Sequence, residues 1–374
     1  MKVDASILRY LSASDFRTLT AIEMGMKNHD LVPLELIERI SKLTRGEVAQ
    51  SIKTVHKAKL VHHESVPYNG YTLNYAGYDA LALNTLVKKG VISGLGHQFG
   101  VGKEADIFLA VTDDEREVVV KFHRLGRTSF REVKNKRNYL DKRKSASWLY
   151  LSRLAAHREA SFMKELYDRG FSVPCLFGYN RHIVVMERAE GFPLTSIERI
   201  ETPPGVDHVF NQIMRCLSDL VKIGLVHCDL NEFNMLLSSE GKVTFIDFPQ
   251  MISIDEAEAK EFFERDLKCC VQYFRNKFGF ECENLPDFDE LKSEASDNLV
   301  TVDSDEVQND DAIEEQHDEN DDENDDENDD EELSNVKKSV QEFHLPKEDF
   351  VRNLLKRQKR NPKMKLKQNK NKSK

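Results

Sequence analysis

The sequence predicts an α+β chain made of a small helical module, a larger mixed domain and a charged, non-globular C-terminal segment. Three observations predict this. Helical periodicity dominates residues 1–90 and ends in a hairpin pattern, whereas residues 91–285 combine β-branched strand patterns with long amphipathic helices. After residue 285 the composition becomes strongly charged. Roughly 300 residues of folded chain exceed one typical domain and suit two folded units.

The N-terminal module carries three helix patterns followed by a hairpin. The helix patterns cover Asp15–Glu23, Pro33–Ile40 and Gly46–Ala58. The strand patterns cover residues 60–63 and 71–75, on either side of an Asn69-Gly70 turn signal. Three helices and a hairpin predict a winged helix, a relative of helix-turn-helix modules. A further helix over Gly77–Leu86 is expected to join it to the second domain.

The third helix pattern is the one that a winged helix presents to a nucleic acid. Lys53, His56, Lys57 and Lys59 surround its apolar face, so it is only modestly basic. Sequence-specific DNA binding is therefore not expected, and contact with RNA or protein is favoured. The alternative is a module that serves only for packing.

Four polar residues of the second domain predict a phosphoryl-transfer site. His227, Asp229 and Asn234 form the pattern H-x-D-x-x-x-x-N, and Asp247 follows thirteen residues after Asn234. Asp229 is placed as a catalytic residue that accepts or orients a hydroxyl proton, while the Asn234 amide oxygen and the Asp247 carboxylate are hard ligands suited to Mg²⁺. The alternative is that these are unrelated polar residues in loops. One motif match alone would favour that alternative, but the combined spacing of all four residues does not.

Two upstream patterns predict contacts with a nucleotide. Gly100-Val101-Gly102-Lys103 is typical of a turn that covers phosphates, although a lone G-x-G pair is more often a simple hairpin turn and the third glycine is absent. The β-branched run Val118–Val120 then leads to Lys121, which could reach the α- and β-phosphates.

Lys121 needs an acidic partner that orients its ammonium group. A helix pattern over Leu151–Leu166 offers Glu159, with Glu165 as the rival. Spacing alone does not decide between them, and both could be surface charges.

Together these motifs resemble the RIO family of atypical kinases. The resemblance rests on Gly102-Lys103-Glu104-x-Asp106, on the H-x-D-x-x-x-x-N pattern, on Ile246-Asp247-Phe248 followed by proline, and on Met186-Glu187-x-x-x-Gly191-x-Pro193-Leu194. It spans roughly residues 90–285, and the preceding winged-helix pattern narrows it to the subfamily that works on the small ribosomal subunit precursor. It implies a truncated, two-lobed protein-kinase-like fold, with an N-lobe over about 91–186 and a C-lobe over about 187–285.

The resemblance also implies ATP and Mg²⁺ as cofactors and assigns further residues. Glu159 is favoured over Glu165 as the partner of Lys121. Met186 would border the adenine pocket, and the backbones of Glu187 and Ala189 would hydrogen-bond the adenine. The resemblance also implies that a helix containing Arg265-Asp266 anchors the catalytic loop. The subfamily commonly has serine where this chain has Ala105, so contacts with phosphate at this turn are left to backbone N–H groups.

The chain after Asp247 leaves little room for a platform that binds peptides. It runs through Phe248–Ile254 into a helical stretch that ends near Phe280. The resemblance points the same way and implies an ATP-dependent kinase or ATPase in late maturation of the small ribosomal subunit, with turnover coupled to release of itself or of other factors. Asp247 is a possible phosphoryl acceptor. The alternatives are a pseudokinase scaffold that binds ATP and pre-ribosomal RNA without chemistry, and a conventional Ser/Thr protein kinase with an external substrate.

A strongly basic stretch lies between Lys121 and the helix of Glu159. Its members are Arg124, Arg127, Arg131, Lys134, Lys136, Arg137, Lys142, Arg143 and Lys144. We expect a mobile loop that can grip a phosphate backbone and, by the resemblance, carry phosphorylation at nearby Ser or Thr residues. A solvated face without a partner is the alternative.

The net charge of −11 belongs to the C-terminal segment. Residues 303–332 hold nineteen Asp and Glu and no Lys or Arg, whereas residues 337–374 hold fourteen basic and three acidic residues, which leaves residues 1–302 at −3. We expect a disordered acidic linker over 286–336 and a basic tail over 337–374 with a possible short helix. Residues 356–374 would bind RNA or direct nuclear import.

The remaining composition bears on compartment. Six cysteines show no C-x-x-C spacing, so neither a zinc site nor a disulfide framework is predicted. No long apolar run or signal peptide is apparent, so no membrane partner is expected. The prediction is a cytoplasmic protein with nuclear shuttling.

Overall fold

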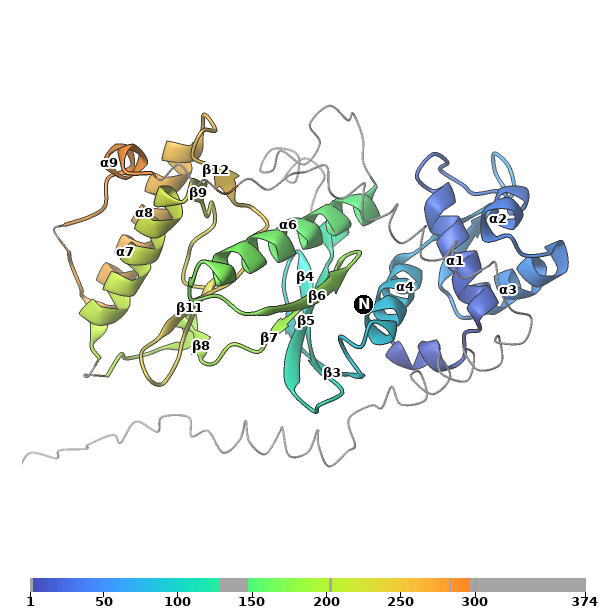
Figure 1. Ribbon diagram of the computed structural model, residues 1–374, viewed down its shortest axis with the longest axis horizontal. Coiled ribbons are helices and arrows are strands. Elements are labelled where there is room, and N and C mark those ends of the chain that lie inside the picture. Colours follow the sequence, from blue (N-terminus) through green and yellow to red (C-terminus); the bar gives the residue numbers. More distant parts are fainter. Residues whose placement is uncertain (1–2, 128–146, 202–203, 283, 296–299, 301–374) are drawn as a thin grey trace, which may run out of the picture.

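The computed structural model describes residues 3–127, 147–201, 204–282, 284–295 and 300. Figure 1 shows three parts in a row along the long axis: the N-terminal helices, a central sheet with α6, and a mainly helical lobe. The basic stretch from residue 128 onward, the acidic run and the basic tail all lie outside the described residues. No helix of the described part is long and apolar enough to cross a membrane.

The N-terminal module folds as the predicted winged helix. Its elements are η1 (Ala5–Arg9), α1 (Ala13–Gly25), α2 (Leu34–Ser41), α3 (Arg45–Lys57), β1 (Val61–Glu64) and β2 (Gly70–Leu73). Ser12 and Thr44 begin α1 and α3 with reciprocal capping hydrogen bonds to Asp15 and Glu47. The hairpin pairs β1 with β2 in antiparallel register, so α3 is followed by a short wing.

Helix α4 (Tyr75–Lys88) links this module to the central sheet. The Asn74 side chain caps it by accepting from the Gly77 N–H at 3.0 Å. Most of its side chains are buried, because one side faces the winged helix and the other faces the sheet. The two folded units therefore share one continuous apolar core.

The central sheet has five antiparallel strands in the order β3-β4-β5-β7-β6. These are β3 (Gly94–Val101), β4 (Ala105–Val111), β5 (Glu117–His123), β7 (Ile183–Glu187) and β6 (Leu176–Asn180). The long helix α6 (Trp148–Asp168) begins at Ser147, which caps the Tyr150 N–H, and packs against β5, β6 and β7. The sheet is thus a layer between α4 and α6 (Figure 1).

Strand β5 presents alternate residues to these two helices. Val118, Val120 and Phe122 pack in the core shared with α4, whereas Val119 packs in the core shared with α6. This period of two is the ordinary geometry of a strand buried on both faces. It places Lys121 on the α6 side.

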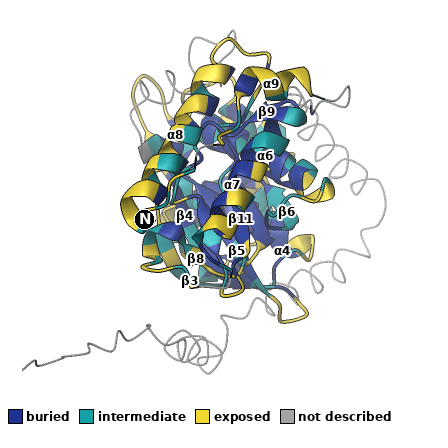
Figure 2. Cartoon of the chain, turned by 90° about the vertical axis from the view of Figure 1, so that its left-hand side faces the viewer, coloured by how far each residue is buried: buried dark blue, intermediate teal, exposed yellow. Residues whose placement is uncertain are grey.

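The C-terminal lobe contains the helices α7 (Val206–Lys222), α8 (Ala259–Phe278) and α9 (Phe288–Ser293). Its short strands are β8 (Phe192–Pro193), β9 (Leu225–Val226), β10 (Met235–Leu237), β11 (Val243–Phe245) and β12 (Ile252–Ser253), and the 3-10 helix η3 (Leu194–Ser196) follows β8. A further 3-10 helix, η2 (Leu125–Arg127), follows β5 of the central sheet. Phe210 of α7 packs against Phe274 of α8 with ring centroids 5.2 Å apart. Figure 2 shows this interior as buried residues, with exposed residues on the outer turns of α8 and α9.

The structure corrects two expectations. Helix α9 forms where the sequence predicts the start of a disordered linker, because Phe288 is buried and stacks near Phe263 at 5.5 Å. The sequence pattern also places Arg124 in a mobile basic loop, yet its side chain is buried beside Asp79 and Asp106. The strand simply continues its apolar and polar alternation past Lys121, so Arg124 is enclosed on the α4 side of the sheet.

Candidate active site

Lys121 lies at the centre of a buried charge cluster. Its Nζ donates to Glu159 Oε1 at 2.6 Å and to Asp247 Oδ1 at 2.8 Å. The contact predicted between Lys121 and Glu159 is present, whereas Glu165 pairs with Arg169 one turn later on α6. A strand, a helix and the segment after β11 thus converge on one ammonium group.

The cluster is electrostatically coupled. Burial disfavours the charged ammonium, but the carboxylates of Asp247 and Glu159 hold the pKa of Lys121 above its ordinary value. Burial opposes ionisation of Asp247 as well, yet the neighbouring Lys121 lowers the pKa of that carboxyl to about 2. Asp247 is therefore ionised at neutral pH, with 36% of its side chain exposed as a reactive or metal-binding group requires.

His123 is a member of the cluster that the sequence reasoning missed. Its Nε2 lies 2.7 Å from Glu159 Oε2, the oxygen that Lys121 does not use. Glu159 is thus held from both sides, and Lys121 and His123 together lower the pKa of its buried carboxyl against the effect of burial. The two-residue spacing from Lys121 on a strand was the available signal.

Asp229 is oriented by two side-chain amides. Asn231 Nδ2 donates to Asp229 Oδ1 at 3.2 Å, and Gln250 Nε2 donates to Asp229 Oδ2 at 3.1 Å. The loop is closed further by the Phe233 N–H, which donates to Asn231 Oδ1 at 2.9 Å. The two amides therefore hold the carboxylate in a fixed orientation.

The backbone adopts left-handed conformations at Asp247 and at the residue before Asp229. Cys228, directly before Asp229, has φ of 65°, and Asp247 has φ of 72°. Such values are uncommon for residues other than glycine and cluster at functional sites. Arg265 of α8 donates to the carbonyl of Cys228 and so supports the catalytic loop from below, as the sequence resemblance implied.

His227 and Asp266 form the buried base of this loop. His227 packs edge-on against Phe248 at 5.7 Å between centroids, and burial lowers its pKa to about 4, so it is a neutral structural group. Burial raises the pKa of Asp266 to about 6, against the opposing effects of Arg265 and of the Leu230 N–H.

Asn234 has the donor set that a magnesium ligand needs. Its Nδ2 donates to the Asp229 carbonyl at 2.9 Å, which leaves Oδ1 as the atom with acceptor capacity for a cation. The Ile246 N–H donates to the Asn234 carbonyl at 3.0 Å, so Asn234 and Asp247 are tied to one another through the backbone. The described residues contain no group of three or more His, Cys, Asp or Glu side chains that could hold a metal ion. An amide oxygen plus one carboxylate fits Mg²⁺, which takes its other ligands from phosphates and water.

The expected nucleotide turn connects β3 to β4. Gly100 pairs with Ile107, and the Gly102 N–H donates to the Ala105 carbonyl at 2.7 Å, which closes the turn. Val101, Gly102 and Lys103 are exposed, so their backbone is accessible to a ligand.

The expected adenine-binding residues lie at the end of β7. Met186 is buried on the α6 side of the sheet, and Glu187 and Ala189 follow in the segment that joins the lobes. The Glu187 N–H donates to the Cys175 carbonyl at 2.8 Å. A hydrogen bond from Glu187 to adenine can therefore involve only its carbonyl, so Ala189 is the residue to supply an N–H.

Comparison with known proteins places this geometry in a family. The family models that match are the RIO domain, over residues 106–286, and the Rio2 N-terminal domain, over residues 8–89. Both folded units described above are thus recognised separately.

Relatives match across the two units together. The chain is 51% identical over 293 residues to serine/threonine-protein kinase rio2 of Dictyostelium discoideum, a match covering 78% of this chain and 56% of that protein. It is 42% identical to serine/threonine-protein kinase rio2 of Schizosaccharomyces pombe, covering 80% of this chain and 86% of that protein. The chain therefore spans little more than half the length of the first relative.

A solved structure shares the fold. The Rio2 kinase of Chaetomium thermophilum, crystallised as an ADP/Mg²⁺-phosphoaspartate complex, superposes with a TM-score of 0.70 at 38% identity, covering 79% of this chain and 90% of that one. The matches in sequence and in structure agree. The chain belongs to the Rio2 family of RIO-type serine/threonine-protein kinases.

Proposed function

We propose that the protein is a RIO-type serine/threonine kinase and ATPase that transfers the γ-phosphoryl group of ATP. The observation that carries this proposal is the position of Lys121, whose ammonium joins Glu159 and Asp247 in one buried cluster. The Asp247 carboxylate of this cluster stays partly exposed, and Asp229 is oriented by two amides, as phosphoryl transfer requires. The solved Chaetomium thermophilum relative, which contains ADP, Mg²⁺ and a phosphoaspartate, supports the same proposal.

The chain offers residues for each part of the nucleotide. Backbone N–H groups of Gly100–Lys103 would contact phosphates, Lys121 would pair with the α- and β-phosphates, and Met186 would border the adenine. Asn234 and Asp247 would hold Mg²⁺, which when bound neutralises charge on the β- and γ-phosphates.

We assign Asp247 as the phosphoryl acceptor. Because its pKa is about 2, the carboxylate is ionised and nucleophilic at neutral pH. An Asp247 oxygen forms a bond to the γ-phosphorus, the bond from that phosphorus to the β,γ-bridging oxygen breaks, and ADP leaves. Water then attacks the phosphorus, Asp229 accepts the water proton, and inorganic phosphate leaves with the carboxylate regenerated.

The segment after Asp247 supports water rather than a peptide as the final acceptor. Phe248, Met251 and Ile254 are buried in the C-lobe core, and α8 begins at Ala259. In the part of the chain that the structure describes, this stretch is therefore folded inward and offers no extended edge for a peptide.

Two variants separate binding from chemistry. Asp229→Ala should abolish turnover while calorimetric titration still shows ATP binding, because Asp229 acts on the proton. Asp247→Ala should lose turnover and also weaken Mg²⁺-dependent ATP binding, because it removes a metal ligand. Wild-type turnover in Asp229→Ala would overturn the assignment.

We further propose that turnover serves late maturation of the small ribosomal subunit (pre-40S), and that it sets how long the protein stays bound to precursor rRNA and its proteins. The winged helix supports contact with RNA, since Lys53, His56, Lys57 and Lys59 are exposed along and just after α3. This role places the protein in the cytoplasm, with nuclear shuttling.

Sedimentation of cell extracts tests this role. Asp229→Ala, which should bind ATP without turning it over, should accumulate on small-subunit precursor particles and delay maturation of their rRNA. If that variant distributes like wild type and the precursor rRNA matures normally, turnover is not coupled to release, and a scaffold function is favoured.

A further inference from the structure

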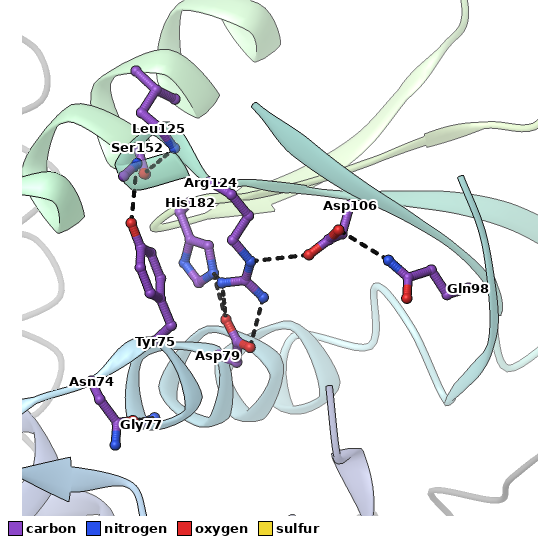
Figure 3. Close-up of polar contacts among 11 residues, drawn as sticks. Asn74, Tyr75, Gly77, Asp79, Gln98, Asp106, Arg124, Leu125, Ser152 and His182 are labelled. Carbon is purple, nitrogen blue, oxygen red and sulfur yellow. Dashed lines mark hydrogen bonds and ion pairs between the residues drawn. The ribbon is translucent and has the colours of Figure 1, made fainter. Parts of the chain in front are cut away.

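A second buried charge network lies on the opposite face of β5 and its C-terminal end, outside the site described above. Figure 3 shows Arg124 between Asp79 of α4 and Asp106 of β4. Arg124 donates to both oxygens of Asp79, at 2.6 and 2.8 Å, and its Nε donates to Asp106 Oδ2 at 3.4 Å. Arg124, Asp79 and Asp106 are all buried. A forked contact of this kind fixes the guanidinium in one orientation.

His182, in the turn between β6 and β7, completes the grip on Asp79. Its Nε2 lies 2.7 Å from Asp79 Oδ1, and its ring stacks on Tyr78 of α4 at 4.7 Å between centroids. The same Nε2 also lies 3.2 Å from Arg124 Nη1, so Asp79, Arg124 and His182 meet at one point. Asp79 therefore binds one group from each of two neighbouring segments of the sheet.

The same network continues toward the nucleotide turn by two further contacts. The backbone N–H of Arg124 donates to the Glu104 carbonyl at 2.5 Å. Asp106, two residues after Glu104, accepts from Gln98 Nε2 at 3.0 Å through its other oxygen. Gln98 lies at a register shift of β3, just before Gly100. Both strands that support the turn, and the turn itself, are thus connected to Arg124.

We propose that Arg124 is a positioning residue for nucleotide binding, and that α4 of the N-terminal module holds the phosphate-covering turn 100–104 in place through Asp79. This inference rests on the proposed function, because it assigns the turn to a nucleotide. Docking of the winged-helix module then sets the affinity of the kinase site. A partner that pulled α4 away from the sheet would release the turn.

The chain contains a matched control at the same interface. Arg181 donates to both oxygens of Glu23 of α1, at 2.8 to 3.0 Å, and so also joins the module to the β6–β7 turn. Arg181 also donates to Thr85 Oγ1 of α4 at 3.3 Å and to Asn180 Oδ1 at 2.7 Å, on the side of the interface away from the turn 100–104. Asp79→Asn and Glu23→Gln therefore each remove one carboxylate charge from a forked pair with arginine, and the first is the pair linked to the turn through Arg124.

The experiment measures the ADP·Mg²⁺ dissociation constant of the full chain by calorimetry, together with amide hydrogen exchange of residues 100–104 without nucleotide. We expect Asp79→Asn to raise the dissociation constant about tenfold, equal to about 1.4 kcal/mol, and Glu23→Gln to change it less than twofold. Exchange in the turn should be faster only in Asp79→Asn.

Gln98→Leu provides a second route that leaves the interface between the modules intact. It removes the hydrogen bond from Gln98 to Asp106, so it should also weaken ADP binding and make amide hydrogen exchange in the turn faster. Equal effects of Asp79→Asn and Glu23→Gln would overturn the inference, and so would an unchanged turn in Gln98→Leu. Hydrogen exchange is measured without nucleotide, so it tests the link between α4 and the turn independently of ADP binding. Wild-type protein that bound no ADP would contradict the proposed function and not this inference.

Discussion

Lys121 in strand β5 and Arg124 directly after the strand are charged residues, three positions apart, whose side chains enter two different environments. Lys121 faces α6 and joins Glu159 and Asp247, with a cluster that remains open enough for Asp247 to be 36% exposed. Arg124 faces α4, where its own side chain is 2% exposed and those of Asp79 and Asp106 are 5% and 0% exposed. The comparison shows that the sheet separates a reactive cluster, formed by Lys121, Glu159 and Asp247, from a holding cluster, formed by Arg124, Asp79 and Asp106, that fixes the N-terminal module on the sheet.

The difference has a physical reason. A cluster that takes part in phosphoryl transfer must keep one carboxylate oxygen accessible, so it is only partly buried. A cluster that fixes one domain on another gains from full enclosure, where the fork of two hydrogen bonds from Arg124 to Asp79 resists rearrangement. The two sites can therefore be separated by mutation.

The largest expected effect belongs to Lys121→Met. We expect turnover to fall by about 10²–10³, because removing one preorganised cationic donor costs about that much in rate. Folding should be less affected than in Arg124→Met, since Asp247 is partly exposed and can be hydrated. Steady-state ATPase rates and urea unfolding of the two variants measure both quantities. A Lys121→Met protein with wild-type turnover would contradict the assignment of the reactive cluster.

Arg124→Met should have the second largest effect, on stability. The substitution leaves Asp79 and Asp106 buried without their cation, a change that costs on the order of 3–5 kcal/mol. Urea unfolding should show this as a lower midpoint. A loss below about 1 kcal/mol, the range of exposed ion pairs, would show that the network is solvated and not a holding contact.

Two buried histidines predict how stability depends on pH. Burial lowers the pKa of His182 and of His227 to about 4, below the value of 6.5 expected in an unfolded chain. The unfolded chain therefore takes up these protons first, so the stabilising contribution is full above pH 6.5 and is lost as the pH falls toward 4. Each histidine accounts for on the order of 3 kcal/mol over that range.

Asp266 has the opposite effect on how stability depends on pH and therefore provides the control. Its pKa is raised to about 6, so the folded state binds that proton first and gains stability as the pH falls through 6. In urea unfolding between pH 7 and pH 4.5, His227→Gln should flatten the loss of stability, and Asp266→Asn should steepen it. The same slope in both variants would contradict the assigned protonation states.

The smallest expected effect concerns RNA. Neutralising the basic residues from Arg131 to Lys144, or deleting residues 356–374, should weaken binding to precursor rRNA and flatten its salt dependence, by about 0.7 in the log–log slope for each lost contact with a single strand. Arg124 belongs to the same basic stretch of sequence, but because it is buried, Arg124→Met should leave that slope unchanged. Filter binding over a salt series measures the slope. An unchanged slope in the first two variants would identify these stretches as solvated surface.

The sequence predicted the reactive cluster better than the holding one. Lys121, Asn234 and Asp247 follow motifs whose spacing reflects the geometry of phosphates and a metal ion, so their roles in one site could be expected from the sequence. Glu159 was favoured over Glu165 only by the family resemblance. Their chemical roles remain predictions.

The holding cluster had no motif to reveal it. The sequence groups Arg124 with its basic neighbours, because charge composition does not tell whether a side chain meets solvent or the buried Asp79. The only local signal was a carboxylate, Asp79, in an otherwise apolar run of α4. His123 and α9 were missed for a similar reason, since tertiary packing and not local pattern decides their environment.

Single-turnover labelling with γ-³²P-ATP tests most directly whether the open side of β5 performs chemistry. We expect wild-type protein to carry label transiently as an acyl phosphate that hydroxylamine removes, with inorganic phosphate as the final product, and we expect Asp247→Asn to carry none. Label that ends on serine or threonine, on this chain or on an added protein, would contradict water as the final acceptor. An Asp247→Asn variant that is labelled like wild type would contradict transfer through Asp247.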